Sequence, residues 1–324
     1  MTTAGDESAL SRELFKNVRV YCWIMTSTNN TRKKAVNVNA TWANRCNKHV
    51  FMTAAQVDGL PTVDLNVTEG REYLWMKTKE AFKHIYNNEL HDYDWFLKAD
   101  DDTFVIMENL RFMLLAYSAD DPIYFGCKFK AFLSQGYMSG GAGYVLSREA
   151  VKRFVEDALP DPRKCKAKNT GAEDVELGKC LQNVAVIAGD SRDSQNRHRM
   201  LPFSPQSHVA SNHTQPKWFY KYMYYSYKQG TECCSDYVIS FHYVNAPMMY
   251  ALNYIIYHVR AFGLVIGDFL DDQTDDAAAD QMSLLERAKQ KAIRYSKPLP
   301  KLVTVEEPEA AELRSMEEKM KKKT

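Results

Sequence analysis

The chain has 324 residues, of which 45% are apolar and 26% are charged, so it can bury the core of one large domain or of two ordinary ones. These proportions exclude collagen-like, coiled-coil and wholly disordered chains. The net charge of +1 argues against recognition of nucleic acid or of an acidic membrane by bulk charge, so partners must be recognised at a defined site.

Residues 17–265 predict one α/β domain in which buried strands alternate with helices. The strands are expected at 18–26, 49–54, 94–102, 123–127 and 143–147. The helices are expected at 32–44, 72–88 and 110–117, at the segment of Val151, Phe154 and Val155, and from about residue 173. This alternation indicates a mainly parallel sheet, in which ligands bind beyond the carboxyl ends of the strands.

Three adjacent acids, Asp100, Asp101 and Asp102, close the apolar segment DWFLK. A solvated acidic turn is one interpretation. The other is a site for a hard divalent cation such as Mg²⁺ or Mn²⁺, because three neighbouring carboxylates repel one another unless a cation or hydrogen bonds hold them. Alternation along a strand places Asp100 and Asp102 on one side and Asp101 on the other.

A glycine-rich run, SGGAG, precedes the strand expected at 143–147 and contains Gly140, Gly141 and Gly143. It is neither a phosphate-binding P-loop nor a dinucleotide-binding motif, because it lacks GK[ST] and does not precede a helix. It is either a plain turn before a strand or a place where the backbone closely approaches a ligand.

Two further segments carry groups that could do chemistry. Glu173 and Asp174 stand where a helix begins, so they either complement the helix dipole or provide a general base. His242 lies in the apolar run VISFHYV, as a core histidine or as a metal ligand that favours Mn²⁺ over Mg²⁺.

Residues 218–227 contain seven aromatic side chains in ten positions, five of them tyrosines. A buried strand does not need so many hydroxyl groups. Rings with polar edges suit the face of a sugar, although a packing segment fits equally well.

The flanking segments differ in composition from this domain. Residues 1–16 are polar and lack a signal pattern. Residues 266–324 are acidic and alanine-rich, then amphipathic over 281–295, then rich in Glu and Lys, so we expect them to be disordered or loosely helical. No stretch reaches the ~18 uncharged apolar residues of a membrane helix.

Seven cysteines, without the C-x₂-C pair of a zinc site, accompany four N-glycosylation sequons. The sequons are at Asn29, Asn39, Asn66 and Asn212. Together these features favour an oxidising secretory compartment over the cytosol that the N-terminus alone suggests.

Ten strings resemble, in the same order, those of the Fringe and β3-galactosyltransferase superfamily (glycosyltransferase family 31): CWIMT, TWANRCNK, EGREYLWMKTKEAF, DWFLKADDDTF, YFGCKFK, QGYMSGGAGYVLSREA, AEDVELGKC, AGDSRD, CCSD and SFHYV. They cover about residues 17–263, and the resemblance is strongest to the core 1 β1,3-galactosyltransferases. It implies a GT-A fold over 17–265, with a mixed, mostly parallel sheet flanked by helices that binds a nucleotide in the Rossmann-like manner. It implies that 1–16 is the remnant of a stem.

The resemblance also implies a reaction. Galactose would pass from UDP-galactose to O3 of GalNAc on Ser or Thr of glycoproteins, by a single inverting displacement that depends on Mn²⁺. The protein would act in the Golgi lumen as a type II membrane protein whose anchor is absent from this sequence. A homodimer is a further expectation, and nucleic acid is not an expected partner.

Site roles follow from the resemblance position by position. Asp102 and His242 would ligate Mn²⁺, Asp100 would support the metal and the donor, and Asp174 would be the general base. The other donor-binding positions would be Met25, Thr26, Lys77, Asp101, Gly140 and Gly141. The acceptor-binding positions would be Trp218, Tyr220 and Glu173.

One departure from the family concerns the acceptor. The family carries a second tryptophan near the position of Tyr220, whereas this chain keeps only Trp218. The acceptor is therefore less well specified than the donor chemistry. We expect disulfides Cys22–Cys46 and Cys165–Cys180 and a vicinal pair Cys233–Cys234, with Cys127 free.

Three other functions compete with this one. The same fold could use a different sugar donor or acceptor. A non-catalytic glycan-binding or chaperone-like relative should have lost an acid or the metal histidine, and both are present. A metal-dependent phosphohydrolase would need a second group of metal ligands, and no second His/Asp group of suitable spacing occurs.

Overall fold

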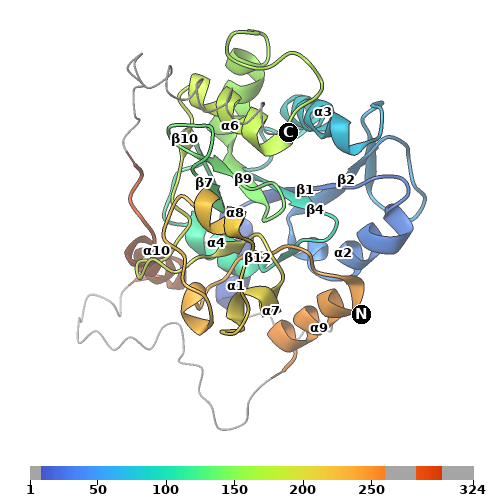
Figure 1. Ribbon diagram of the computed structural model, residues 1–324. Helices are drawn as coiled ribbons and strands as arrows, with labels where there is room; N and C mark the ends of the chain where they lie inside the picture. The colour runs from blue at the N-terminus through green and yellow to red at the C-terminus, as the bar shows by residue number, and fades with distance from the viewer. Residues whose placement is uncertain (1–8, 260–281, 301–324) are drawn as a thin grey trace.

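The structure is a computed structural model that describes residues 9–259 and 282–300 (Figure 1). Its central sheet has seven strands in the order β10-β6-β9-β4-β1-β2-β3. Neighbouring strands run parallel except at β9, which is antiparallel to both β4 and β6. The strands are β1 (Val20–Met25), β2 (Lys48–Thr53), β3 (Thr62–Asp64), β4 (Trp95–Asp100), β6 (Ile123–Gly126), β9 (Tyr144–Ser147) and β10 (Ile187–Ala188).

The predicted α/β fold with a mostly parallel sheet is confirmed. β1 is buried along its whole length because helices cover both of its faces, which explains its continuous run of apolar residues. The reversed direction of β9 was not predicted, since an apolar run carries no information about the direction of a strand. β6 and β9 are joined by residues 127–143 without a crossover helix, as antiparallel neighbours allow.

Helices cover both faces of the sheet, as Figure 1 shows for α3 and α6 on one side and α4 and α9 on the other. The first face carries α3 (Leu74–Asn88), α5 (Arg148–Arg153) with the π-helix η4 (Phe154–Ala158), and α6 (Glu173–Asn183). The second face carries α1 (Ala9–Asn17), the π-helix η1 (Thr31–Ala35), α2 (Val36–Ala40), α4 (Met107–Leu114) and α9 (Ala246–Tyr257). The carboxyl ends of β1 and β4 lie between these layers.

Short elements build one wall beyond the end of β4. β5 (Phe104–Val105), β11 (Met200–Leu201) and β12 (Ser240–Phe241) form a small sheet. The apolar run around His242 is therefore a strand of only two residues, with His242 directly after it. The aromatic segment forms α8 (Lys217–Tyr222), which follows α7 (Pro205–Val209), while β7 (Lys128–Phe129) pairs with β8 (Tyr137–Met138).

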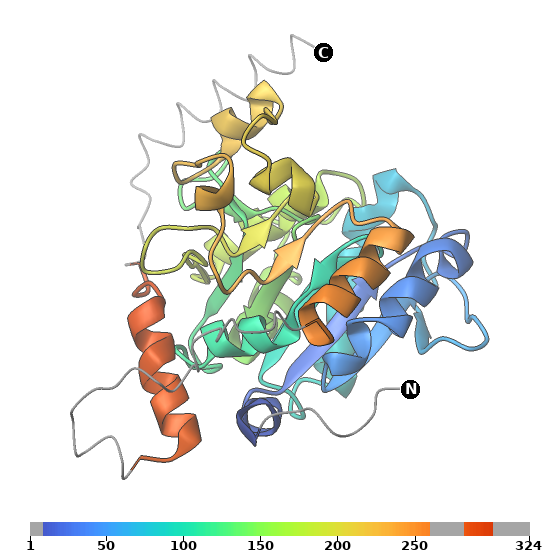
Figure 2. The same cartoon turned by 90° about the horizontal axis from the view of Figure 1, so that it is seen from below.

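Part of the C-terminal segment is a packed helix. α10 (Leu284–Tyr295) lies against α4 and buries Ala288 and Ala292 (Figure 2). Arg199 donates a hydrogen bond to the backbone oxygen of Tyr295 at 2.7 Å. Of the segment 266–324, residues 266–281 and 301–324 lie outside the described residues. None of the helices in the described part of the chain is long and apolar enough to cross a membrane.

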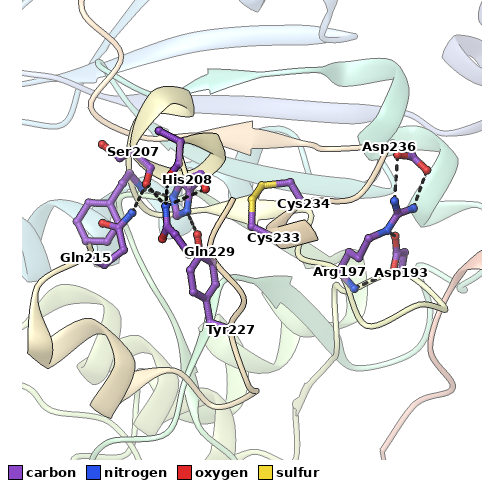
Figure 3. Close-up of a disulfide and its surroundings, with 12 residues drawn as sticks. Asp193, Arg197, Ser207, His208, Gln215, Tyr227, Gln229, Cys233, Cys234 and Asp236 are labelled. Carbon is purple, nitrogen blue, oxygen red and sulfur yellow. Dashed lines mark hydrogen bonds and ion pairs between the residues drawn. A yellow bond between two sulfur atoms is a disulfide. The ribbon is translucent and has the colours of Figure 1, made fainter. Parts of the chain in front are cut away.

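Three disulfides connect six of the seven cysteines, and Cys127 is free and buried. Cys22–Cys46 joins β1 to the residues before β2, and Cys165–Cys180 joins α6 to the loop that precedes it. Cys233–Cys234 is a vicinal pair beside the loops around α7 (Figure 3). These are the pairs expected from the sequence.

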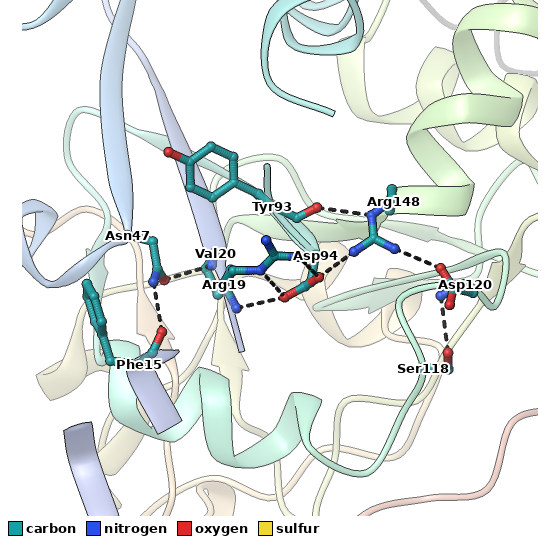
Figure 4. Close-up of polar contacts among 9 residues, drawn as sticks. All are labelled: Phe15, Arg19, Val20, Asn47, Tyr93, Asp94, Ser118, Asp120 and Arg148. Atoms are coloured by element: carbon teal, nitrogen blue, oxygen red, sulfur yellow. Dashed lines mark hydrogen bonds and ion pairs between the residues drawn. The ribbon is translucent and has the colours of Figure 1, made fainter. Parts of the chain in front are cut away.

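An ion-pair network joins the amino ends of β1 and β4 (Figure 4). The Asp94 carboxylate accepts hydrogen bonds from Arg19 Nη2 at 2.7 Å and Nε at 3.0 Å, and from Arg148. Arg148 also pairs with Asp120 at 2.8 Å. Asp94 is largely buried, whereas the side chain of Asp120 is 81% exposed, so the two acids should differ in their contribution to stability.

Replacing Asp94 with alanine should lower the free energy of unfolding by about 2 kcal/mol, because two guanidinium groups lose a largely buried partner. Asp120→Ala is the matched control, and it should cost less than about 1 kcal/mol because that pair is exposed. Urea unfolding of both variants measures the difference. Equal midpoints would contradict this account of the network.

Candidate active site

The acidic turn Asp100–Asp102 leaves the end of β4 and is fixed by neighbouring segments. Thr103 follows the turn, and its hydroxyl donates a hydrogen bond to the backbone oxygen of Gly141 at 2.8 Å. The indole nitrogen of Trp42 donates to the backbone oxygen of Thr103 at 2.9 Å. The turn therefore rests on the glycine-rich run on one side and on the core of the second helical layer on the other.

Asp100, Asp102 and His242 come together at this turn. One ligand atom from each lies within 4.8 Å of the others, and no other group of three or more such residues occurs in 9–259 and 282–300. His242 Nε2 is 3.1 Å from Asp102 Oδ1 and 3.7 Å from Asp100 Oδ2. Two carboxylates and an imidazole are a donor set that fits a divalent transition metal such as Mn²⁺.

Asp102 is ionised in this setting. Burial acts to raise its pKa, but hydrogen bonds from His242 and from Lys34 outweigh burial and lower the pKa to about 2. Asp101 is not one of the three residues of that group, and it accepts a hydrogen bond from the Thr26 hydroxyl at 2.8 Å. Burial raises the pKa of Asp101.

Gly141 allows His242 to reach the acids. A Cβ atom at position 141 would lie 2.2 Å from Cε1 of the His242 ring, far inside van der Waals contact. A Cβ atom at Gly140 would lie 2.9 Å from Oε2 of Glu173. The glycine-rich run is therefore required for close approach of side chains from α6 and from the residue after β12, rather than for a turn alone.

A cavity of about 340 Å³ opens beside the acidic turn. Lys33, Lys34 and Asn37 line it on one side, and Tyr243, Asn245 and Met249 on another. Lys34 Nζ lies 2.9 Å from Asp102 Oδ2 and 3.4 Å from Asp101 Oδ1. Lys34 was not singled out from the sequence, where the only signal was a basic helix expected at 32–44.

The residues expected to bind the nucleotide meet at the end of β1. The Lys77 ammonium donates a hydrogen bond to the backbone oxygen of Thr26 and lies 3.8 Å from Glu69. Burial lowers the pKa of Lys77, while Glu69 opposes that shift. Met25 is buried just before Thr26. The sequence analysis did not find Glu69.

Asp174 is placed on the other side of the glycine-rich run. It is the second residue of α6, and its Oδ2 accepts a hydrogen bond from the backbone nitrogen of Gly140 at 3.2 Å. Burial raises the pKa of Asp174, although backbone hydrogen bonds from Gly140 and Val175 act against that rise. Gly140 and Gly141 therefore separate a carboxylate of raised pKa from the Asp–Asp–His cluster.

Glu173 does not share this position. Its Oε1 accepts hydrogen bonds from the Tyr144 hydroxyl at 2.6 Å and from the Thr78 hydroxyl at 3.0 Å, and the side chain is buried. This setting favours a role in fixing the start of α6 over the acceptor contact expected from the sequence.

Lys98 lies between the Asp–Asp–His cluster and the start of α6. It was not predicted, since a lysine inside an apolar strand gives no signal of its own. Its ammonium is buried and donates to Asp100 Oδ1 and, at 3.0 Å, to the backbone oxygen of Gly140. Although burial acts to lower its pKa, the neighbouring carboxylates of Asp100, Glu173 and Asp174 raise it. Lys98 is therefore a buried cation that balances the acids on both sides.

Replacing Lys98 with methionine should lower kcat/KM for sugar transfer about tenfold. It should also shift the acidic limb of the pH profile to higher pH, because the lysine charge lowers the pKa of Asp174 and its removal lets that pKa rise further. Steady-state rates across pH measure both effects. Lys83→Met, at an exposed position of α3, is the control, and an unmoved acidic limb in Lys98→Met would contradict this role.

An aromatic wall extends from the cluster. The ring of Tyr243 stacks on His242, with centroids 3.9 Å apart, and on Phe203, with centroids 6.2 Å apart. Trp218 continues the wall, 5.9 Å from Phe203. Tyr243 is 59% exposed and Trp218 is 45% exposed, so each offers an uncovered ring. Tyr243 was missed in the sequence analysis although it directly follows His242.

Tyr220 points away from this wall. Its ring packs on Phe219 and Tyr227, and its hydroxyl accepts a hydrogen bond from the backbone nitrogen of Gln215 at 3.2 Å. On a helix, residues two apart do not share a face, which separates Tyr220 from Trp218. Of these two expected acceptor-binding rings, only Trp218 packs directly on Phe203.

A hydrogen-bond network fixes the loops behind the wall (Figure 3). His208 Nε2 accepts from the backbone nitrogen of Phe203 at 3.1 Å, and Nδ1 pairs with the Tyr227 hydroxyl at 2.6 Å. Burial lowers the pKa of His208 to about 3, so the ring is neutral. Gln229 donates to the backbone oxygen of Ser207 at 2.8 Å. The position of Phe203 in the wall is thereby set.

Comparison with known proteins agrees with this geometry. Residues 16–207 match the family described as Fringe-like. A Xenopus laevis protein, glycoprotein-N-acetylgalactosamine 3-beta-galactosyltransferase 1, is 48% identical over 260 residues, which cover 80% of this chain and 71% of that protein. The chain belongs to the Fringe-like glycosyltransferases. The expected family is thus confirmed, and the protein is an enzyme of that class.

Two less similar relatives carry other names. A beta-1,3-glucosyltransferase of Mus musculus is 28% identical over 46% of this chain and 30% of its own length. Human chondroitin sulfate synthase 3 is 26% identical over 55% of this chain and 22% of its own length. These matches cover about half of the chain, whereas the Xenopus protein covers most of it.

Proposed function

We propose that the protein transfers galactose from UDP-galactose to O3 of GalNAc attached to Ser or Thr of glycoproteins. The observation that carries the proposal is the arrangement of Asp174 and the Asp100–Asp102–His242 cluster on opposite sides of Gly140 and Gly141. The name of the 48% identical relative supports the choice of donor sugar and acceptor.

Asp100, Asp102 and His242 would hold Mn²⁺. When bound, the ion neutralises the diphosphate of the donor and stabilises its departure as a Lewis acid. The ionised state of Asp102 supports this role. The lysines beside the cavity, Lys33 and Lys34, would complement the remaining negative charge of the diphosphate. Thr26, Asp101 and Lys77 would hold the nucleoside end at the carboxyl end of β1.

Asp174 would remove the proton from the O3 hydroxyl of the acceptor. That oxygen attacks the anomeric carbon of galactose from the face opposite UDP, the bond from that carbon to the diphosphate oxygen breaks, and the configuration inverts. The raised pKa of Asp174 suits a general base, because a more basic carboxylate accepts a proton more readily. Lys98 would lower the pKa of Asp174 while it pairs with Asp100.

The exposed rings of Trp218 and Tyr243 would contact the acceptor sugar. Aromatic faces bind the apolar face of a sugar ring, and their edges leave its hydroxyl groups free to make hydrogen bonds. Glucose transfer is the second candidate, and the 28% identical β1,3-glucosyltransferase favours it.

Location and assembly belong to the same proposal. Three disulfides and four sequons support an oxidising lumen, and we propose that the protein acts in the Golgi. A homodimer remains an expectation from the family.

The test is incubation of the protein with a GalNAc-threonine peptide and UDP-galactose, with Mn²⁺ or with a chelator, followed by mass spectrometry. We expect one added hexose with Mn²⁺ and none with the chelator. UDP-glucose in place of UDP-galactose is the competing donor. If a product forms from UDP-glucose but not from UDP-galactose, the donor is UDP-glucose and the proposed donor is wrong.

A further inference from the structure

The four sequons differ in their structural setting. Asn66 stands in the loop between β3 and the 3₁₀ helix η3 (Arg71–Tyr73), and both Asn66 and Thr68 are exposed. Asn66 adopts a left-handed backbone, with φ of 50°, and its backbone nitrogen donates to Asp64 Oδ1 at 2.8 Å. The backbone is held by this contact, while no hydrogen bond of the described residues uses the Asn66 side chain.

Asn212 has a similar setting. It lies in the loop between α7 and α8, where 211–214 are all exposed. The backbone nitrogen of His213 donates a hydrogen bond to the backbone oxygen of Ala210 at 3.2 Å, which closes a turn. Within the described ranges, the side chains of Asn212 and Thr214 are likewise without a hydrogen-bond partner.

The other two sequons lie in more crowded places. Asn39 is half-buried in α2, its Oδ1 lies 2.8 Å from His49 Nε2, and Thr41 is buried. Asn29 is exposed but stands three residues after Thr26, at the end of β1 where the nucleotide is proposed to bind. A large substituent on Asn39 would meet packed side chains, and one on Asn29 would meet the proposed active site.

We propose that Asn66 and Asn212 are the N-glycosylation sites of this protein. The amide nitrogen of the asparagine would bond to the anomeric carbon of an oligosaccharide carried on a polyprenyl diphosphate. The bond from that carbon to the diphosphate breaks, the amide loses one proton, and the polyprenyl diphosphate leaves. The inference rests on the proposed secretory location and not on the proposed sugar transfer.

The reason for the selection is steric. An oligosaccharide attached to the chain must be accommodated when the chain folds, so a glycosylated asparagine needs its side chain in solvent. Exposed loops satisfy this condition because few contacts are lost there, and they are where such modification is tolerated. Asn66 and Asn212 meet the condition through both residues of the sequon, whereas Thr41 is buried at the Asn39 sequon.

The test uses the full chain directed into the secretory pathway of cultured eukaryotic cells. Glycopeptide mass spectrometry with peptide N-glycosidase treatment should find glycans on Asn66 and Asn212 and unmodified Asn39. Thr68→Ala and Thr214→Ala should each remove one glycan, and together both. Thr68→Ser and Thr214→Ser are matched controls, because they keep the sequon and should keep the glycan.

The alanine variants alter exposed side chains, so their melting temperatures should match wild type. Unmodified Asn66 and Asn212 in the secreted wild type would overturn the proposal, as would a glycan on Asn39 in their place. Galactose transfer by the same samples reports on the proposed function separately. If the protein transfers galactose but carries no glycan on Asn66 and Asn212, the proposed modification sites are wrong and the proposed function still stands.

Discussion

Replacement of Asp174 by asparagine is expected to lower kcat about 10³-fold, within the range of general acid–base contributions. The amide oxygen can still accept the hydrogen bond from the Gly140 backbone, which holds the turn, and only the local hydrogen bond from the Val175 backbone is lost. The amide cannot take the proton of the acceptor hydroxyl. The fold and the KM for UDP-galactose should therefore stay near wild type while the chemical step slows.

Glu176→Gln is the matched control for Asp174→Asn. Glu176 belongs to the same first turn of α6 and pairs with Lys166 at 3.0 Å, away from the metal cluster. It should leave kcat nearly unchanged. If both variants lose activity equally, activity depends on the negative charge at the start of α6 and not on a general base at Asp174. A near-normal kcat in Asp174→Asn would exclude Asp174 as the base.

The wild-type enzyme should lose activity as pH falls. The midpoint of this loss should lie at a higher pH than the pKa of an ordinary aspartate. Burial raises the pKa of Asp174 above the usual value of about 3.9, so protonation removes the base earlier on the acidic side. The pH dependence of kcat/KM with saturating Mn²⁺ measures this limb, and it should disappear in Asp174→Asn. A limb that persists unchanged in that variant would belong to another group.

Gly141→Ala is expected to weaken Mn²⁺ binding and to lower kcat/KM by about 10²-fold, the upper range for residues that orient metal ligands. The added Cβ would lie 2.2 Å from Cε1 of His242, so the ring must move away from Asp102. Mn²⁺ titration and steady-state kinetics measure the two effects.

A double-mutant cycle separates this mechanism from a general loss of stability. His242→Ala alone should reduce Mn²⁺ affinity at least as strongly as Gly141→Ala. If the alanine at 141 acts by displacing the ring, adding it to His242→Ala should cost little further affinity. Fully additive losses would show that Gly141 acts through something other than His242.

The sequence predicted the framework of the site because buried strands and their ends are marked by local pattern. The apolar run of β1 and the acids that close β4 were visible without a structure. Their position beyond the carboxyl end of a sheet strand directed attention to Asp100 and Asp102. The helix at Asp174 was also visible as a first turn rich in acids.

The contacts that complete the site were not predictable, since they join residues far apart in the chain. The glycine run signalled close approach, but only the packing of His242 against Gly141 identifies the group that approaches. Lys98 is hidden in an apolar strand, and its partners outside that strand come from two other segments, the glycine-rich run and the start of α6. The direction of Tyr220 depends on how α8 packs, which composition alone does not fix.

The linkage of the product tests the central claim most directly. Galactose is to be transferred from UDP-galactose to a GalNAc-threonine peptide in the presence of Mn²⁺, and the product analysed by nuclear magnetic resonance. We predict a β-linked galactose on O3 of GalNAc, since one base and one displacement invert the α-linkage of the donor. An α-linked product, or galactose on another hydroxyl, would contradict the proposed mechanism.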